Sequence, residues 1–282
     1  MQWSLVTYLI ERWKLTGVKF GLLVVGGVLL CMIIPYLLGS LNAGLILSRK
    51  KYHDDIREHG SGNAGTTNML RTYGKKAAII TLLGDMFKAF VAVSLGYLIL
   101  DTSIYENGAM LFANHSGAAI AGLFVMIGHM FPIFYKFKGG KGVATSAVVV
   151  LMISPVSFLF CFSTFVIIVV GTKYVSLGSC MGMIFYPIIL KAFSGEENPT
   201  AQIMAVLMAC LVVFMHRENL KRLSQGKESK LSFGKKKPAA EAADGAPPAS
   251  ADQIEGEGVE SAESDKGNKG NKKKTKKKGK NK

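Results

Sequence analysis

The chain has 282 residues, 49% of them hydrophobic, and a formal net charge of +15. These averages combine two regions, because residues 18–216 are dominated by apolar runs whereas residues 226–282 hold almost none. The composition excludes a soluble globule and predicts an integral membrane domain followed by a polar tail. The four cysteines lie in apolar stretches without C-x-x-C spacing, which argues against a disulfide framework or a zinc site.

The first 17 residues form a leader that contains Trp3, Trp13 and charges of both signs. Tryptophan is enriched at the level of the lipid headgroups, so we expect a short interfacial helix; a disordered leader is the alternative. No small-residue cleavage pattern follows the first apolar run, so the start does not match a standard secretory signal.

Apolar runs then predict a series of membrane-crossing helices. A helix rises about 1.5 Å per residue and needs about 20 residues to cross a hydrocarbon core of about 30 Å. The predicted spans include residues 18–47, 77–100, 109–128, 177–193 and 200–215. Asp85 and Lys88 interrupt the second span and lie three apart on one helix face, where they can pair; solvation near the interface is the alternative.

Residues 143–172 allow two interpretations, one continuous span or two short helices broken at Ser154 and Pro155. Cytoplasmic loops collect Lys and Arg, and the break places every basic loop on one side and both acidic turns on the other. We therefore predict an all-α fold of seven membrane helices, two of them short, with the N-terminus outside and the C-terminus in the cytoplasm. The basic leader opposes this orientation.

The polar tail divides into an acidic block and a lysine block. Residues 239–265 hold 8 acids and no base, and residues 266–282 hold 10 lysines and no acid. Such segments cannot bury enough apolar surface to fold, so we expect a disordered appendage. The lysine block can touch anionic lipid or another acidic surface, and we expect no specific nucleic-acid binding. The predicted organisation is a leader (1–17), a membrane domain (18–228) and a tail (229–282).

Two glycine-rich segments share the predicted cytoplasmic face. Gly60–Arg71 places three glycines and two asparagines before a helix, which is typical of an anion-binding helix N-terminus, although a membrane-surface turn explains it about as well. It lacks the Gly-Lys-Ser/Thr end of a Walker A loop. Gly128–Thr145 surrounds Lys141 with glycines, so that backbone N–H groups and one full charge can point at an anion. His129 can act there as a base or hydrogen-bond donor; a histidine bonded to a backbone carbonyl is the alternative.

A third polar segment, His216–Arg222, follows the last predicted span. His216 and Asn219 are three apart and share a helix face, whereas Arg217 and Lys221 lie on a neighbouring face suited to juxtamembrane anchors. The chain has no Gly-x-Ser-x-Gly elbow and no cysteine in the three segments, which argues against a covalent acyl-enzyme. No Asp or Glu lies near His129 or His216 at the spacing of metal ligands, so we expect no metal and no cofactor.

Together these segments resemble the PlsY family of bacterial acyl-phosphate:glycerol-3-phosphate acyltransferases. The matching stretches are YLLGS (36–40), DIREHGSGNAGTTNMLRTYGKKA (55–77), GHMFPIFYKFKGGKGVAT (128–145), VSLGS (175–179) and HRENLKRLSQGKE (216–228). The resemblance covers residues 20–228 in family order and spacing. Departures from the family pattern occur at Asn42, Ala43, Thr66, Gly84 and Ala89.

The resemblance implies a seven-helix enzyme of the bacterial cell membrane with its active site and C-terminal tail on the cytoplasmic side. Such an enzyme moves an acyl chain from acyl-phosphate to the 1-hydroxyl of sn-glycerol 3-phosphate and yields lysophosphatidic acid. The implied substrate-binding residues are Ser61, Gly62, Asn63, Thr67, Asn68, Arg71, Gly139, Gly140 and Gly142, with Ser176 and Ser179 both candidates for a further serine. The implied catalytic residues are Lys141, His216, Asn219 and, as a lesser candidate for proton transfer, His129.

The chemistry agrees with the resemblance. Acyl-phosphate is an activated mixed anhydride, so the glycerol hydroxyl can attack directly while Arg71 and Lys141 hold the two phosphates. The alternative is a membrane transporter or channel for an anionic solute. A transporter of that kind predicts inverted repeats and polar residues at the bilayer midplane. The chain shows no such repeat, and its polar residues cluster at one surface.

Overall fold

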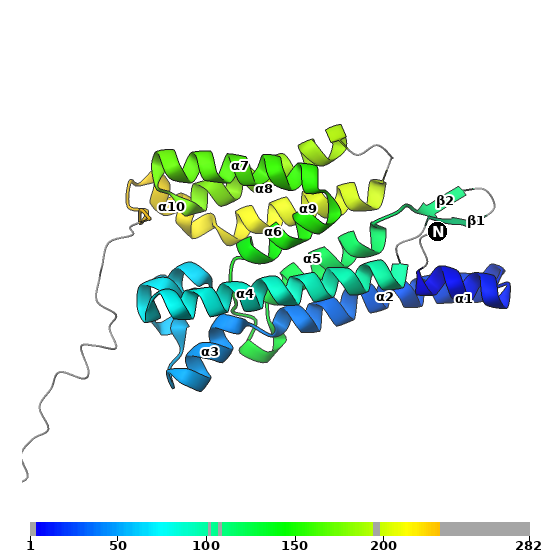
Figure 1. Ribbon diagram of the computed structural model, residues 1–282, viewed down its shortest axis with the longest axis horizontal. Coiled ribbons are helices and arrows are strands. Elements are labelled where there is room, and N and C mark those ends of the chain that lie inside the picture. Colours follow the sequence, from blue (N-terminus) through cyan, green and yellow to red (C-terminus); the bar gives the residue numbers. More distant parts are fainter. Residues whose placement is uncertain (1–3, 101–102, 107–108, 194–197, 232–282) are drawn as a thin grey trace, which may run out of the picture. The chain divides into compact units, whose positions relative to one another are not determined.

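The computed structural model describes residues 4–100, 103–106, 109–193 and 198–231. Within these ranges the chain forms a helical bundle with one short hairpin (Figure 1). The elements in chain order are α1 (Leu5–Trp13), α2 (Gly17–Ser40), α3 (Ala43–Lys51), η1 (Ile56–Glu58), α4 (Thr66–Leu100), β1 (Ile104–Glu106), β2 (Ala109–Phe112), α5 (Ser116–Met130), η2 (Ile133–Tyr135), α6 (Val143–Ile153), α7 (Pro155–Thr172), α8 (Val175–Phe193), α9 (Pro199–Met215) and α10 (Arg217–Ser224).

Helix α5 lies at the centre of the bundle, where it packs against α2, α4, α6 and α9 (Figure 1). Nearly all of its residues are buried. The crossing with α2 depends on glycine, because a Cβ on Gly128 would overlap the Tyr36 carbonyl oxygen and one on Gly39 would overlap the Val125 carbonyl oxygen. Small residues at such crossings let two backbones approach closely. The same crossing fixes the end of α5 that carries His129.

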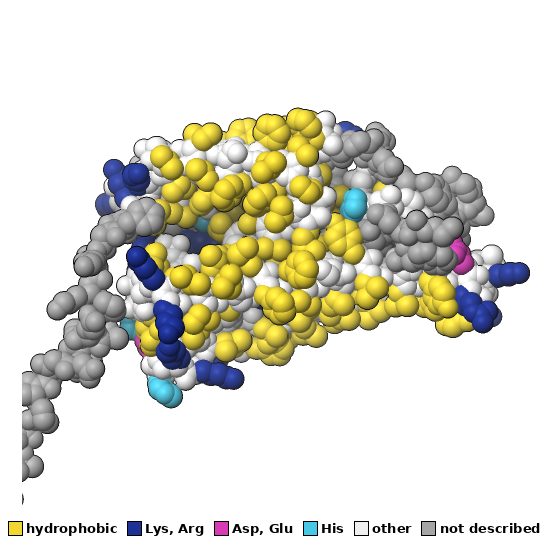
Figure 2. Space-filling model, viewed as in Figure 1, with side chains coloured by type: hydrophobic (Ala, Val, Ile, Leu, Met, Phe, Trp, Pro, Cys, Tyr) yellow, Lys and Arg dark blue, Asp and Glu magenta, His cyan; other side chains and the backbone are white. Residues whose placement is uncertain are grey.

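The outer helix faces carry large exposed apolar side chains, which spread over the flank seen in Figure 2. Five helical segments of the described chain are long and apolar enough to cross a membrane, and the bent α9–α10 pair makes a sixth. Helix α6 has 11 residues, and its length of about 16 Å is too short to cross a core of about 30 Å alone. The helical architecture is confirmed, and the count of seven spans stays a prediction.

One predicted helix break is confirmed and another was missed. The chain breaks before Pro155 as expected, and the Ser154 hydroxyl accepts from the Ser157 N–H at 3.2 Å to cap α7. The predicted span 18–47 was wrong as a single helix, because α2 ends at Ser40. Asn42 starts α3 by accepting the Leu45 N–H at 3.0 Å. The first N–H groups of a helix have no partner within it, and an asparagine oxygen can accept from one of them even inside an apolar run.

The structure also differs from the prediction near the first residues of the second and third predicted spans. Helix α4 contains a kink at Gly74, whose φ of 83° is outside the helical region, so a short helix from Thr66 that carries Arg71 precedes the predicted span 77–100. The third span was expected from residue 109, but 109–112 is the strand β2, antiparallel to β1, and α5 begins only at Ser116. The predicted leader helix is present as α1. Trp3, the acidic turn at 194–197 and the tail from 232 lie outside the described residues.

Candidate active site

A cavity of about 760 Å³ gathers residues from all three polar segments. The predicted site residues that line it are Ser61, Asn63, Thr67, Asn68, Arg71, His129, Lys141, Gly142, Ser176, Ser179, His216 and Asn219. Three predicted residues, Gly62, Gly139 and Gly140, are not part of its lining. Residues up to 158 positions apart in the sequence, Ser61 and Asn219, therefore meet in one place.

The first wall is the glycine-rich loop before α4, and Asn68 holds it together. The Asn68 Oδ1 accepts from the Ser61 N–H at 3.0 Å, and its Nδ2 donates to the carbonyls of Ile56, His59 and Asn63 at 2.9–3.1 Å. Because these bonds use the whole amide, Asn68 shapes the loop rather than offering a free group to a ligand. Arg71, one turn further on, is exposed at the cavity.

The second wall is the glycine-rich turn after α5, which folds back onto the end of that helix. The Gly139 N–H donates to the Met130 carbonyl and the Gly140 N–H to the His129 carbonyl, both at 3.1 Å. A Cβ on Gly140 would overlap the His129 imidazole, and Gly142 has a φ of 76°, which favours glycine. Gly139 and Gly140 thus position the turn, and Lys141 presents its ammonium to the cavity.

A hydrogen-bonded group that we call the Lys141 network joins this turn to the third segment. Lys141 Nζ donates to Asn219 Oδ1. Asn219 Nδ2 and the Ser176 hydroxyl donate to Glu228 Oε1 at 2.6 and 2.9 Å. Arg222 Nε donates to Glu228 Oε2 at 2.9 Å. The network contains two cations and one carboxylate, so it carries a surplus positive charge at the cavity wall.

Burial and neighbours change the proton affinities of this network. Burial lowers the pKa of Lys141 to about 8, because Glu228 compensates only in part for lost solvation and Arg222 adds repulsion. Glu228 also loses solvation, but the hydrogen bonds from Asn219, Ser176 and Arg222 outweigh that loss and hold its pKa below the ordinary value. At neutral pH the network therefore keeps both a protonated lysine and an ionised glutamate.

The buried His216 has a defined tautomer. Its Nδ1 lies 2.8 Å from the Val212 carbonyl oxygen, which can only accept, so Nδ1 carries the proton. In the neutral ring, Nε2 is then left with a free lone pair, and the residue lines the cavity. Such a nitrogen can accept a proton from a hydroxyl.

A second charged group, which we call the Lys88 cluster, lies behind His129. Lys88 Nζ contacts Asp85 Oδ1 and His129 Nδ1 at 2.9 Å each, and it donates to the Gly39 and Leu41 carbonyls at 2.9 and 3.1 Å. The predicted Asp85–Lys88 pair is confirmed, and both side chains are buried rather than solvated. An ammonium always donates, so His129 Nδ1 accepts and its proton lies on Nε2. His129 can thus donate through Nε2, the ring atom next to Gly140, whereas the Nε2 of His216 can accept.

The remaining wall of the cavity is apolar and belongs to α6, α7 and α8. It is lined by Val150, Phe158, Cys161, Phe162, Phe165 and Met183. One end of the cavity is therefore cationic and the other suits a hydrocarbon chain. Within the described residues, no group of three or more His, Cys, Asp or Glu side chains could hold a metal ion.

The family model for glycerol-3-phosphate acyltransferase matches residues 29–226. The chain belongs to the glycerol-3-phosphate acyltransferase family. A glycerol-3-phosphate acyltransferase of Thermoanaerobacter pseudethanolicus is 41% identical over 202 residues, which are 72% of this chain and 94% of that protein. One of Paraburkholderia phytofirmans is 38% identical over 212 residues, 75% of this chain and 94% of its own.

Solved structures of this acyltransferase family show the same fold. The crystal structure of PlsY, an integral membrane glycerol 3-phosphate acyltransferase, in its glycerol 3-phosphate form superimposes with a TM-score of 0.61 at 34% identity. The match covers 73% of this chain and 96% of that one. The lysophosphatidic acid form gives a TM-score of 0.60 at 32% identity. With its apolar helices, this acyltransferase is a membrane-embedded, multi-pass protein.

Sequence reasoning overlooked two residues that line the candidate site, Arg222 and Glu228. Glu228 is only partly buried as a residue, but its side chain is 6% exposed and its carboxylate bonds to three side chains at the cavity. The available signal was its place as the last residue of the matching stretch 216–228. Ser176 reaches this carboxylate, whereas the Ser179 hydroxyl donates to the Val175 carbonyl of its own helix at 2.8 Å.

Proposed function

We propose that the protein transfers an acyl group from acyl-phosphate to the 1-hydroxyl of sn-glycerol 3-phosphate, giving 1-acyl-sn-glycerol 3-phosphate and phosphate. The observation that carries this proposal is the single cavity with a cationic end and an apolar wall. A lysophosphatidic acid has the same two-part chemistry, a phosphate headgroup on a hydrocarbon chain. Membership of the family is the independent support.

The cationic end offers enough charge for two phosphates. Arg71 and Lys141 come from different walls, and the surplus positive charge of the Lys141 network is not neutralised by Glu228. In our proposal these two cations hold the phosphates of donor and acceptor so that the hydroxyl faces the acyl carbon. The acyl chain lies along the apolar wall between Val150 and Phe158.

The transfer is a direct displacement without an acyl-enzyme. The glycerol hydroxyl oxygen attacks the acyl carbonyl carbon, the bond from that carbon to the phosphate oxygen breaks, and phosphate leaves. The hydroxyl proton passes to His216 Nε2, whose lone pair faces the cavity. The Nε2–H of His129 is the better candidate for a donor to a phosphate or carbonyl oxygen.

The proposal includes a topology and a location. The α6–α7 pair, broken at Ser154 and Pro155, enters the membrane and returns to the cytoplasmic side, and the seven membrane helices are α2, α4, α5, α6, α7, α8 and α9. Basic residues at 49–51, 136–141 and 217–222 favour the cytoplasmic side for the site, in a bacterial cell membrane. The tail, residues 229–282, would extend into the cytoplasm, where its lysines can touch anionic lipid or another acidic surface.

Purified full-length protein, acyl-phosphate and labelled glycerol 3-phosphate test the function directly. We expect labelled lysophosphatidic acid and one phosphate released per acyl group transferred. Absence of any acylated product would overturn the assignment. Product formed from acyl-CoA and not from acyl-phosphate would leave the acceptor in place and reject the donor.

A further inference from the structure

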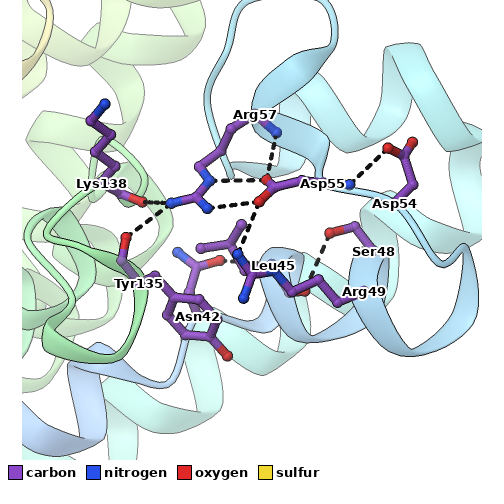
Figure 3. Close-up of polar contacts among 9 residues, drawn as sticks. All are labelled: Asn42, Leu45, Ser48, Arg49, Asp54, Asp55, Arg57, Tyr135 and Lys138. Carbon is purple, nitrogen blue, oxygen red and sulfur yellow. Dashed lines mark hydrogen bonds and ion pairs between the residues drawn. The ribbon is translucent and has the colours of Figure 1, made fainter.

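The two glycine-rich walls of the cavity are joined by a side chain that belongs to neither of them. Arg57 precedes the first glycine-rich loop and reaches across to the segment before the second (Figure 3). Its Nη1 donates to the Tyr135 carbonyl at 2.9 Å and to the Lys138 carbonyl at 3.2 Å. Lys138 is followed at once by Gly139, so this contact ends where the second wall begins.

The guanidinium is itself held rigidly by Asp55. Arg57 Nε donates to Asp55 Oδ1 at 2.9 Å and Nη2 to Asp55 Oδ2 at 2.6 Å, which is a bidentate pair (Figure 3). Arg49 Nη2 approaches the same carboxylate at 3.0 Å from the outer side. The hydrogen bonds from Arg57 hold the pKa of Asp55 well below its usual range, so the carboxylate stays ionised at neutral pH. A planar fork of this kind fixes direction as well as distance.

Arg57 also lies beside the first wall. A Cβ added to Gly62 would be 3.5 Å from the Arg57 carbonyl oxygen, an ordinary van der Waals distance. The Asn68 amide, which organises the loop, donates to the carbonyl of the adjacent Ile56 at 3.1 Å. Arg57 thus follows directly after the residue that Asn68 of the first wall holds, and its side chain bonds to the segment that leads into the Gly139–Gly142 wall.

We propose that Arg57 is a positioning residue that sets the separation between the two phosphate-holding walls. This inference rests on the proposed function for its catalytic consequence. Arg57 does not line the cavity, and four of the five N–H groups of its guanidinium donate to protein acceptors, so it acts through Arg71 and Lys141 and not on substrate. The distance between the two phosphates decides whether the hydroxyl meets the acyl carbon, and an error of about 1 Å in such placement costs about a hundredfold in rate.

The test compares Arg57→Lys with Arg49→Lys in the full-length protein. Lysine keeps the charge but cannot grip Asp55 with two bonds while donating to two carbonyls. We expect Arg57→Lys to lower kcat by about tenfold to a hundredfold, with KM for each substrate within about threefold, in a protein that stays folded. Arg49→Lys shares the carboxylate but bonds no carbonyl of the second segment, so its kcat should stay within about twofold. Equal kinetics for the two variants, with Arg57→Lys folded, would overturn the proposal.

Hydrogen exchange gives a readout that does not require activity. In Arg57→Lys, the amides of Gly139 and Gly140 should exchange at least tenfold faster than in the Arg49→Lys control, because the segment that leads into the second wall has lost its anchor. Unchanged exchange would refute the coupling even if the wild-type protein proved inactive with acyl-phosphate. Faster exchange in an inactive wild type would support the coupling and reject the proposed function. Should Arg57→Lys not fold, Arg57→Gln is measured in the same way, since its amide can still donate to one carbonyl.

Discussion

The Lys88 cluster and the Lys141 network border the same cavity, yet they handle charge in opposite ways. Lys88 directs its ammonium at Asp85, His129 and two backbone carbonyls, and it is 7% exposed. Lys141 has one neutral partner, Asn219, and shares a single carboxylate with Arg222 through the network. The first lysine is saturated by protein groups, whereas the second has donors left for a ligand.

This difference separates a structural charge from a functional one. A buried lysine that directs its three N–H groups at protein acceptors has little capacity left to bind an anion. A half-buried cation with surplus charge around it attracts one. Lys88 therefore caps the α2–α3 break at Gly39 and Leu41, whereas Lys141, which lines the cavity, is the lysine that we propose for substrate phosphate.

The largest effect on turnover is expected at Lys141. Lys141→Ala should lower kcat/KM for glycerol 3-phosphate or acyl-phosphate by about a thousandfold, because a desolvated charge-assisted contact to phosphate is lost. The control is Lys138→Ala, three residues away, whose exposed ammonium does not line the cavity. Steady-state kinetics with both substrates measures the two variants side by side. Near-normal turnover in Lys141→Ala would end the distinction between the two lysines.

A smaller effect is expected at His216. His216→Gln removes the nitrogen lone pair, and we expect kcat to fall about a hundredfold, within the usual range for general base catalysis. Melting temperature should be measured alongside, because His216 is buried and bonds to Val212. A folded variant that keeps a third or more of wild-type kcat would show that the leaving phosphate takes the proton.

The pH profile should show Lys141 titrating. With a pKa lowered to about 8, Lys141 is protonated below pH 8 and loses its charge above it. We expect kcat/KM, which reports the free enzyme, to fall about tenfold for each pH unit above 8. Lys141→Arg should remove that decline, because a guanidinium stays charged throughout this range. A wild-type profile flat to pH 10 would contradict the assignment.

The smallest effect on turnover is expected at Lys88, where the cost falls on stability. Lys88→Met leaves the buried Asp85 carboxylate without its ion-pair partner and should lower the free energy of unfolding by about 3 kcal/mol. Activity per folded molecule should stay within about threefold of the wild-type value. The double variant with Asp85→Asn should recover part of that loss, since no buried charge is left alone. Denaturation in micelles, followed by activity of the folded fraction, measures both. A hundredfold loss of turnover at full stability would make Lys88 part of the catalytic apparatus.

Local signals in the sequence were enough for the helix break at Pro155 and for the three polar segments. Pro155 lacks an N–H and Ser154 can cap the following helix, so these two adjacent residues are enough to predict the break. Asn42 offers the same kind of cap, but it lies in an unbroken apolar run that reads as continuous helix. The hairpin before α5 was hidden for a similar reason, because its second strand has the same apolar composition as a span.

Contacts between distant residues could not be read from the sequence. Lys88 and His129 are 41 residues apart, Arg57 and Lys138 are 81 apart, and Ser176 and Glu228 are 52 apart. Each depends on how helices pack, which local patterns do not encode. The tautomers of His129 and His216 follow from those contacts and therefore also required the structure.

The position of Glu228 has a practical consequence for where the chain can be shortened. The family match ends at residue 226, but the Glu228 carboxylate bonds to Ser176, Asn219 and Arg222. The Leu231 N–H then donates to the Lys173 carbonyl at 2.7 Å. A stop codon after Gly226 would therefore remove a side chain of the site itself, whereas one after Leu231 would delete only the tail. Fusion partners and affinity tags belong beyond that second boundary.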